Sequence, residues 1–183
     1  MNYSQADKLQ LLMLCDIYRE LNIENSFNPD VIEEAISTDN YWALSWNNEA
    51  LGGNEELPNE VKFVVDAIEM YLQLEYTYSN MSEDDKAEVA EAIPNFSPEK
   101  SLSFPGFYIN RETKYYQIAR LLKMLNCFEG TDITLNSHIP LFDTYRRMLT
   151  TFIPARDKFI HNIGIPKQDF INTFLERIHP ENR

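Results

Sequence analysis

The stretch from Pro58 to Asn80 constrains the fold most, because its large apolar side chains recur at the three- and four-residue spacing of one helix face. The stripe consists of Val61, Val65, Ile68, Leu72 and Tyr76, and Val64 and Tyr71 broaden it. This pattern predicts a long amphipathic helix that buries one face and forms the central helix of the fold.

Similar patterns predict further helices, several of which begin with residues that cap helix N-termini. Ser4 with Asp7 suits the start of the first helix, Asn28 with Pro29 the second, and Ser82 a later one. The helices beside the central one are predicted at residues 5–21, 29–37, 41–46, 81–93, 110–125, 140–152 and 166–178. The run 94–107 is predicted to be irregular, and residues 52–58 mark a break between helices.

No segment alternates apolar and polar residues as a half-buried strand does, and the chain has only five glycines. We therefore predict an all-α fold without a substantial sheet, a compact bundle of roughly seven to eight helices. At 183 residues the chain fits a single helical domain over 1–183, in which residues 82–101 could project as an insertion.

Cysteine usage and the N-terminal sequence both point to a cytoplasmic protein. Cys15 and Cys127 lie far apart in apolar segments, which suits two reduced thiols in the core. The N-terminal stretch lacks a basic region, and its apolar run is too short for a signal peptide or a membrane span. We expect no membrane association.

The net charge of −13, from 29 acidic and 16 basic residues, makes DNA an unlikely partner because such a surface repels polyanions. The acidic excess lies mostly in the first hundred residues. Eight basic residues gather between Gly106 and Lys158, which leaves room for a locally basic cleft: Arg111, Lys114, Arg120, Lys123, Arg146, Arg147, Arg156 and Lys158.

Two segments of the second half, FPGFYINRETKYYQIARLL (104–122) and LNSHIPLFDTYRRMLTTF (135–152), closely resemble the YfbU family of bacterial proteins. The segment VDAIEMYLQL (65–74) is similar to the central helix of that family, and KLQLLMLCDIYREL (8–21) to its opening helix. The resemblance spans nearly the whole chain. It implies a helical, cytoplasmic, self-associating bacterial domain without a settled biochemical activity. It also suggests a toxin-like role linked with cell death.

Arg156, Asp157 and His161 form the pattern R-D-x-x-x-H, which is similar to the signature of HEPN-domain ribonucleases. In those helical proteins the pattern meets its symmetry mate across a homodimer. Metal-independent RNA cleavage needs proton transfer, which histidine can perform, and a cation beside the phosphate, which arginine supplies. In the structural alternative, Arg156 ends the preceding helix and pairs with a carboxylate, and His161 is half-exposed and bonded to a backbone group.

A second candidate site centres on His138, which could act as an acid or a ligand in a cleft with Arg147, Glu112, Asn110 and Tyr145. The structural alternative assigns the same residues to turns and helix ends. Asn136 or Ser137 then caps a helix that starts at Pro140, the imidazole ties two loops, and Asn110 and Glu112 serve another helix start. The aromatic residues Tyr41, Trp42 and Trp46 suit a core or a dimer surface.

Nothing in the sequence indicates a metal or a cofactor, because the three histidines and two cysteines lack the spacing of zinc or di-iron ligands. Phosphate loops, dinucleotide fingerprints and hydrolase elbows are also missing. Two hypotheses follow. The first is an interaction or regulatory module that forms homodimers and binds a protein partner. The second is an RNA-cleaving enzyme that uses Arg156 and His161, so whether the chain is an enzyme stays open.

Overall fold

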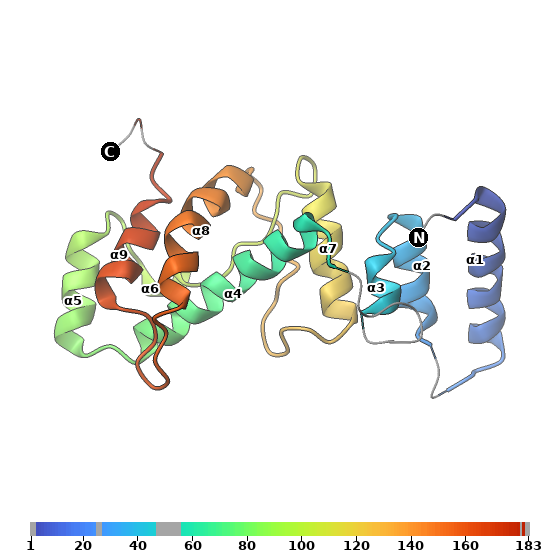
Figure 1. The fold of residues 1–183 in the computed structure, drawn as a ribbon, viewed down its shortest axis with the longest axis horizontal. Coiled ribbons are helices and arrows are strands. Elements are labelled where there is room, and N and C mark those ends of the chain that lie inside the picture. Colours follow the sequence, from blue (N-terminus) through green and yellow to red (C-terminus); the bar gives the residue numbers. More distant parts are fainter. Residues whose placement is uncertain (1–2, 25–26, 47–55, 180, 182–183) are drawn as a thin grey trace. The chain divides into compact units, whose positions relative to one another are not determined.

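The computed structural model describes residues 3–24, 27–46, 56–179 and 181. Within these residues the chain forms nine helices and no strand, and its only bridge pairings are Phe107 with Asn136 and Ile160 with Gly164 (Figure 1). This confirms the predicted all-α class. The predicted break at residues 52–58 falls largely outside the described part of the chain.

The chain divides into two compact units: residues 1–62 with 117–131, and residues 63–116 with 132–183. Unit 1 contains α1 (Gln5–Glu20), α2 (Pro29–Ser37), α3 (Trp42–Ser45) and the second half of α7 (Thr113–Met124). A single domain over 1–183 stays a prediction.

The predicted N-caps of the first two helices are confirmed. Ser4 and Asp7 form a reciprocal capping box at the start of α1, and the Asn28 side chain accepts a hydrogen bond from the Asp30 amide at the start of α2. The core of unit 1 lies where α2, α3 and α7 meet. It contains Val31, Ala35, Ala43 and Leu121, with Trp42, Leu44, Met124 and Leu125 packed against them.

Helix α4 (Asn59–Ser79) is the long helix predicted from the apolar stripe. Val64, Ile68, Tyr71 and Leu74 are at most 2% exposed, whereas three of the predicted stripe residues, Val65, Leu72 and Tyr76, are only half-buried. The buried face is thus turned slightly from the predicted one, and the residues expected to broaden the stripe lie at its centre.

The remaining helices belong to unit 2: α5 (Glu83–Ala92), α6 (Pro98–Ser101), α8 (Phe142–Arg156) and α9 (Lys167–Leu175). Helix α9 packs on both α8 and α5, and Ser82 caps α5 as predicted (Figure 1). Several boundaries differ from prediction. Helices α7 and α8 begin two or three residues later than expected, α8 continues to Arg156 instead of ending at residue 152, and α9 ends at Leu175 instead of residue 178. Helix α6 lies inside the run predicted to be irregular.

An aromatic cluster fills the centre of unit 2. Tyr145 is fully buried, and its ring centroid lies 5.9 Å from that of Tyr71, 5.7 Å from that of Phe104 and 5.4 Å from that of Phe107. Edge-to-face and offset ring packing of this kind adds to the burial of the rings themselves. The cluster joins α4, α8 and the 104–107 turn.

Several connections between helices bend at left-handed residues, and most of these residues are not glycine. Among the described residues, positive φ angles occur at Asn22, Asp39, Asn95, Asn126, Phe128, His138 and Asn162, and at Gly106, Gly130 and Gly164. Asparagine and aspartate tolerate this conformation better than other side chains do.

Candidate functional site

The predicted ribonuclease segment lies at the end of α8 and in the turns that follow it. Helix α8 ends at Arg156, and the backbone then turns back on itself, so that Ile160 and Gly164 exchange backbone hydrogen bonds of 2.9 and 2.8 Å. Asp157 and His161 therefore do not share the face of one helix. Both are exposed.

The Arg156 guanidinium is bound to two carboxylates of α4. Its Nη1 donates to Asp66 Oδ1 at 2.8 Å and to Glu69 Oε2 at 3.4 Å. The hydrogen bond to Asp66 is the main cause that raises the pKa of Arg156 above its ordinary value. This is the arrangement of the structural alternative, in which a helix-terminal arginine pairs with acidic side chains.

His161 lies in a loop whose exposed side chains are mainly apolar. We call residues 159–163 the 159–163 loop, in which Phe159, Ile160 and Ile163 are 37%, 57% and 57% exposed. The Asn162 amide donates to the Tyr76 hydroxyl, and the Ile165 amide donates to Thr77 Oγ1, so α4 holds the C-terminal end of the loop by hydrogen bonds. The Tyr76 ring also packs on Phe159 at the start of the loop. An apolar surface of this kind suits a protein contact better than a phosphate backbone.

Glu112 has a structural role that the sequence analysis assigned to the wrong partner. Its Oε1 accepts hydrogen bonds from the amides of Leu141 and Phe142 at 2.7 and 2.6 Å, and its Oε2 accepts one from Tyr108 at 2.9 Å. Glu112 is 5% exposed. The carboxylate thus caps the N-terminus of α8, where no side chain of the N-cap residue itself does so.

Asn136, expected to cap α8, instead ties two loops together. Its Oδ1 accepts hydrogen bonds from the amides of Ile109 and His138, and its Nδ2 lies 3.3 Å from His138 Nδ1. The expectation that the His138 imidazole makes this tie, or that Pro140 starts the helix, is wrong. His138 is exposed and takes a left-handed backbone conformation, with φ of 59°.

Tyr145 and Arg147 support the same region from α8. The Tyr145 hydroxyl donates to the Gly106 carbonyl at 2.6 Å, and burial raises the pKa of this phenol. Arg147 Nε donates to the Glu176 carbonyl at 3.1 Å. Asn110 is exposed. Of the five residues of the predicted cleft, Glu112, Tyr145 and Arg147 are thus buried or bonded to the backbone, whereas the other two are exposed. A catalytic role for these residues stays a prediction.

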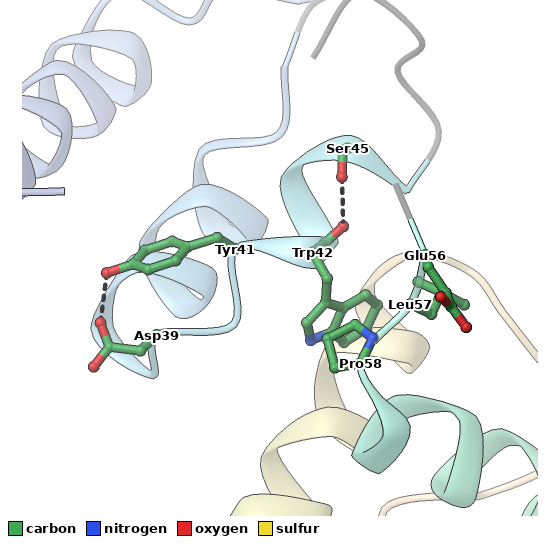
Figure 2. A pocket seen from close by; sticks show the side chains of 7 residues that line it. All are labelled: Asp39, Tyr41, Trp42, Ser45, Glu56, Leu57 and Pro58. Carbon is green, nitrogen blue, oxygen red and sulfur yellow. Dashed lines mark hydrogen bonds between the residues drawn. The ribbon is translucent and has the colours of Figure 1, made fainter. Parts of the chain in front are cut away.

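Unit 1 contains a hollow that the sequence analysis did not predict, with a volume of about 210 Å³. Figure 2 shows the lining side chains, which are Asp39, Tyr41, Trp42, Ser45, Glu56, Leu57 and Pro58. The Tyr41 hydroxyl donates a hydrogen bond to Asp39, and Trp42 and Pro58 both line the hollow. Two carboxylates and two aromatic rings are chemically suited to a cation.

Lysines of the chain itself already neutralise both carboxylates of this hollow. Lys8 binds Asp39 and lies 5.7 Å from the centre of the Tyr41 ring, and Lys62 binds Glu56. The hydrogen bond from Lys8 is the main cause that lowers the pKa of Asp39. The hollow therefore has less attraction for a foreign cation than its composition suggests. Its residues come from separate segments, so no local motif could have predicted it.

A further unexplained feature is the α1 outer face, which we define as Leu9, Met13, Leu14, Ile17 and Leu21. These side chains are 59%, 56%, 54%, 50% and 65% exposed. Leu14 lies at the edge of this face, where it also lines a groove with Cys15 and Ile32. Leu9, Met13, Ile17 and Leu21 recur at helical spacing in the sequence, yet the buried residue of α1 is Cys15. Several large apolar side chains exposed on one helix are typical of interaction sites in soluble proteins.

The comparison with protein families decides the identity of the chain. The sequence profile described as "YfbU domain" matches residues 1–163. The chain belongs to the YfbU family.

Two bacterial relatives of this YfbU chain bear the name UPF0304 protein. The protein of Actinobacillus succinogenes is 33% identical over 98 residues, which cover 49% of this chain and 51% of the relative. The protein of Pasteurella multocida is 28% identical over 150 residues, covering 76% of this chain and 82% of the relative. The chain thus matches about half the length of the first relative and most of the second. Neither name states an activity.

Three further properties of this YfbU chain concern metal ligands, membrane spans and cysteines. In the part of the chain that the structure describes, no three histidine, cysteine or acidic side chains are placed to hold a metal ion. Over the same residues, no helix has the length and apolar character needed to cross a bilayer. Both cysteines are free thiols, Cys15 buried and Cys127 half-buried.

Proposed function

We propose that this YfbU protein is a self-associating interaction module and that the α1 outer face carries the association. The observation behind this proposal is the row of five large apolar side chains on α1, each at least half exposed. Burying one such side chain fully contributes roughly 1.5–3 kcal/mol, so even partial burial of five against a partner favours association. Further exposed apolar residues, Ile23 and Phe27, follow the helix in sequence.

The residues singled out from the sequence support this proposal in a different way. Glu112, Tyr145 and Arg156 are bonded to backbone or carboxylate groups of unit 2, which suits scaffold roles. A regulatory function acting through partner binding requires such a scaffold and no catalytic group. Its cytoplasmic location, its protein partner and a toxin-like role linked with cell death belong to the same proposal, on the strength of the family resemblance.

Sedimentation equilibrium of two matched double variants tests the proposal. Met13→Glu/Ile17→Glu places two charges on the α1 outer face, and Ile160→Glu/Ile163→Glu places the same two charges on the equally exposed 159–163 loop. We expect the wild type and the loop variant to form dimers and the α1 variant to sediment as a monomer. A monomeric wild type, or an α1 variant that associates as well as the wild type, would overturn the proposal.

The alternative function is a metal-independent, HEPN-type ribonuclease that uses Arg156 and His161 across a homodimer. Its support is the sequence pattern alone, since in the structure Arg156 is engaged by Asp66 and Glu69. The test is RNA cleavage in EDTA by the wild type and by His161→Ala. This alternative requires the wild type to cleave and the variant to lose most of that activity. Equal activity in both proteins, or none in either, removes it.

A further inference from the structure

We infer that α1 pairs with α1 of a second copy in antiparallel orientation, with Leu9 against the partner's Leu21 and Met13 against the partner's Ile17. The inference rests on the proposed self-association and adds the occupant, its direction and its register. Three properties of α1 support it: the spacing of the exposed residues, their symmetry and the placement of charges.

The exposed residues form one ridge, because Leu9, Met13, Ile17 and Leu21 follow each other at four-residue intervals. Such i±4n ridges are the surface features that interdigitate in the commonest class of helix packing. All four side chains are at least 50% exposed, so the ridge runs the length of the helix and ends on its C-cap residue.

The contacts of α1 within unit 1 fix which way this ridge points. Helix α2 packs against the opposite side of α1, where Cys15 is 3% exposed and Arg19 bonds to Asp30 and Glu33 of α2. Figure 1 shows α1 lying beside α2, with its other side turned away from that helix. Lys8 adds a bond to Asp39. Rotation of α1 to bury the ridge against α2 would break these contacts.

The ridge has the same spacing of large apolar residues in both chain directions, so it can pair with an antiparallel copy of itself. A two-fold axis between Met13 and Ile17 places residue 9 opposite residue 21 and residue 13 opposite residue 17 of the other copy. The same patch then serves both subunits, as a two-fold interface requires. Every ridge residue faces another large apolar side chain in this arrangement.

Charge selects the antiparallel direction over the parallel one. In a parallel pair each charged residue of α1 faces itself, so Asp16 meets Asp16 and Glu20 meets Glu20 in a chain that already carries a net charge of −13. In the antiparallel register Asp16 lies opposite Leu14 and Glu20 lies opposite Gln10 of the other copy, while Lys8 and Arg19 keep their bonds within unit 1. Like charges no longer meet, and the two helix dipoles oppose each other.

A charge exchange between positions 9 and 21 tests direction and register together. The two residues are twelve positions apart, about 18 Å along one helix, so they cannot pair within a chain. Leu9→Lys/Leu21→Glu creates two opposite-charge pairs in the proposed dimer, whereas Leu9→Glu/Leu21→Glu creates two repulsive pairs. At low salt we expect the dissociation constant of the Glu/Glu variant to exceed that of the Lys/Glu variant by about 100-fold, corresponding to about 1.4 kcal/mol at each of the two pairs.

The outcomes separate this inference from the proposed function. If the wild type dimerises but both double variants dissociate equally, the register fails and self-association stands. If the wild type is a monomer, self-association itself fails. Circular dichroism shows whether each variant keeps the helix content of the wild type. If a variant loses helix, the cross-linking experiment below tests the register instead.

Disulfide cross-linking supplies an independent readout. Under mild oxidation, a mixture of Leu9→Cys and Leu21→Cys chains should form covalent dimers between the two variants. Either variant alone should not form them above the wild-type level set by Cys15 and Cys127. Efficient cross-linking of Leu9→Cys with itself would instead show a parallel pair, and cross-linking of Leu9→Cys with Ile17→Cys a shifted register. Either result overturns the inference.

Discussion

Glu112 caps helix α8, because its carboxylate Oε1 accepts a hydrogen bond of 2.7 Å from the amide of Leu141. Glu112 lies 29 residues before Leu141 in the chain. The next amide of the helix donates to the same oxygen. Because the carboxylate is buried and bonded to main-chain donors of two segments, it fixes the start of α8 relative to the turn that contains Tyr108.

Replacing Glu112 by alanine should therefore destabilise the protein by about 3 kcal/mol, because three amides lose a charged acceptor and two of them lie at a helix N-terminus. Glu112→Gln keeps one acceptor oxygen and should cost less. Urea unfolding measures both values. Glu91→Ala, an exposed glutamate of α5, is the control and should change the free energy of unfolding by less than about 0.5 kcal/mol.

Gly106 and Gly130 form a matched pair for a second prediction, since both have positive φ angles of 80° and 85°. A Cβ at Gly106 would lie 1.8 Å from the Leu135 carbonyl oxygen, whereas one at Gly130 would meet nothing within 4 Å. Gly130→Ala should cost about 1–2 kcal/mol for the left-handed backbone alone. Gly106→Ala should cost several times more or prevent folding, as thermal unfolding or the soluble yield would show. Similar melting temperatures for the two variants would contradict the close approach.

Thr77 offers a test of how α4 holds the segment before α9. Its hydroxyl donates to the Gln73 carbonyl at 2.6 Å and accepts from the Ile165 amide at 3.1 Å. Thr77→Val keeps the shape but leaves the buried Ile165 amide unsatisfied, which should cost about 1–3 kcal/mol in urea unfolding.

Thr150→Val is the control for this change. The Thr150 hydroxyl makes the same donation to a carbonyl four residues earlier in its helix, but the residue is exposed. We expect a change of less than about 0.5 kcal/mol for this variant. Equal effects at the two positions would mean that Ile165 finds another partner.

The bond between α5 and α9 predicts a dependence of stability on pH. Two hydrogen bonds hold the pKa of Asp85 below its ordinary value of 3.8, and the one from Lys167 has a larger effect than the one from Ser82. The contribution of Asp85 is therefore complete above pH 3.8 and is lost as the pH falls through the lowered pKa. Asp85 in turn raises the pKa of Lys167 above 10.5, so the contribution of Lys167 is complete below that pH and is lost as the pH rises through the raised pKa.

Lys167→Met should reduce the acid part of this dependence to the share that Ser82 contributes. Urea midpoints measured between about pH 2 and pH 7 would reveal the change. Because the Lys167 and Asp85 side chains are 34% and 38% exposed, water and salt partly screen the pair, and the effect should shrink at high salt. Lys100→Met removes the same charge from α6 and should leave the acid limb of the profile as steep as in the wild type. A Lys167 variant with an unchanged acid limb would show that the pair contributes nothing.

The sequence predicted those parts of the fold that depend on neighbouring residues. The N-caps Ser4, Asn28 and Ser82 each bond to an amide two or three positions away, so the residue types alone indicate where their helices begin. The long helix α4 followed in the same way from its apolar spacing. Resemblance of the two motif segments was sufficient to indicate the family.

Contacts between distant segments could not be predicted. Glu112 and the α8 amides are separated by 29 and 30 residues, so their bond depends on how the 104–107 turn packs. Arg156 likewise finds Asp66 across 90 residues of chain. The pattern R-D-x-x-x-H contains no information about that partner.

Helix α1 shows a different limit of prediction from sequence, because it has large apolar residues on both faces. Leu11 and Cys15 lie toward α2, and Leu9 and Met13 lie away from it. Periodicity identifies a helix in such a sequence but cannot say which face the fold buries. That choice is made by α2, through the ion pairs of Arg19 with Asp30 and Glu33.

The left-handed residues between the helices have a consequence for how the chain folds. A glycine at such a bend is free to adopt many conformations before folding, whereas asparagine, aspartate or histidine adopts fewer. Asn22, Asn95 and Asn126 therefore sample fewer backbone conformations in the denatured state than glycine would. Each of them also holds some backbone strain in the folded state. Replacing all three by glycine should relieve that strain. It should nevertheless slow refolding, because the backbone at these three positions would sample more conformations before the helices pack.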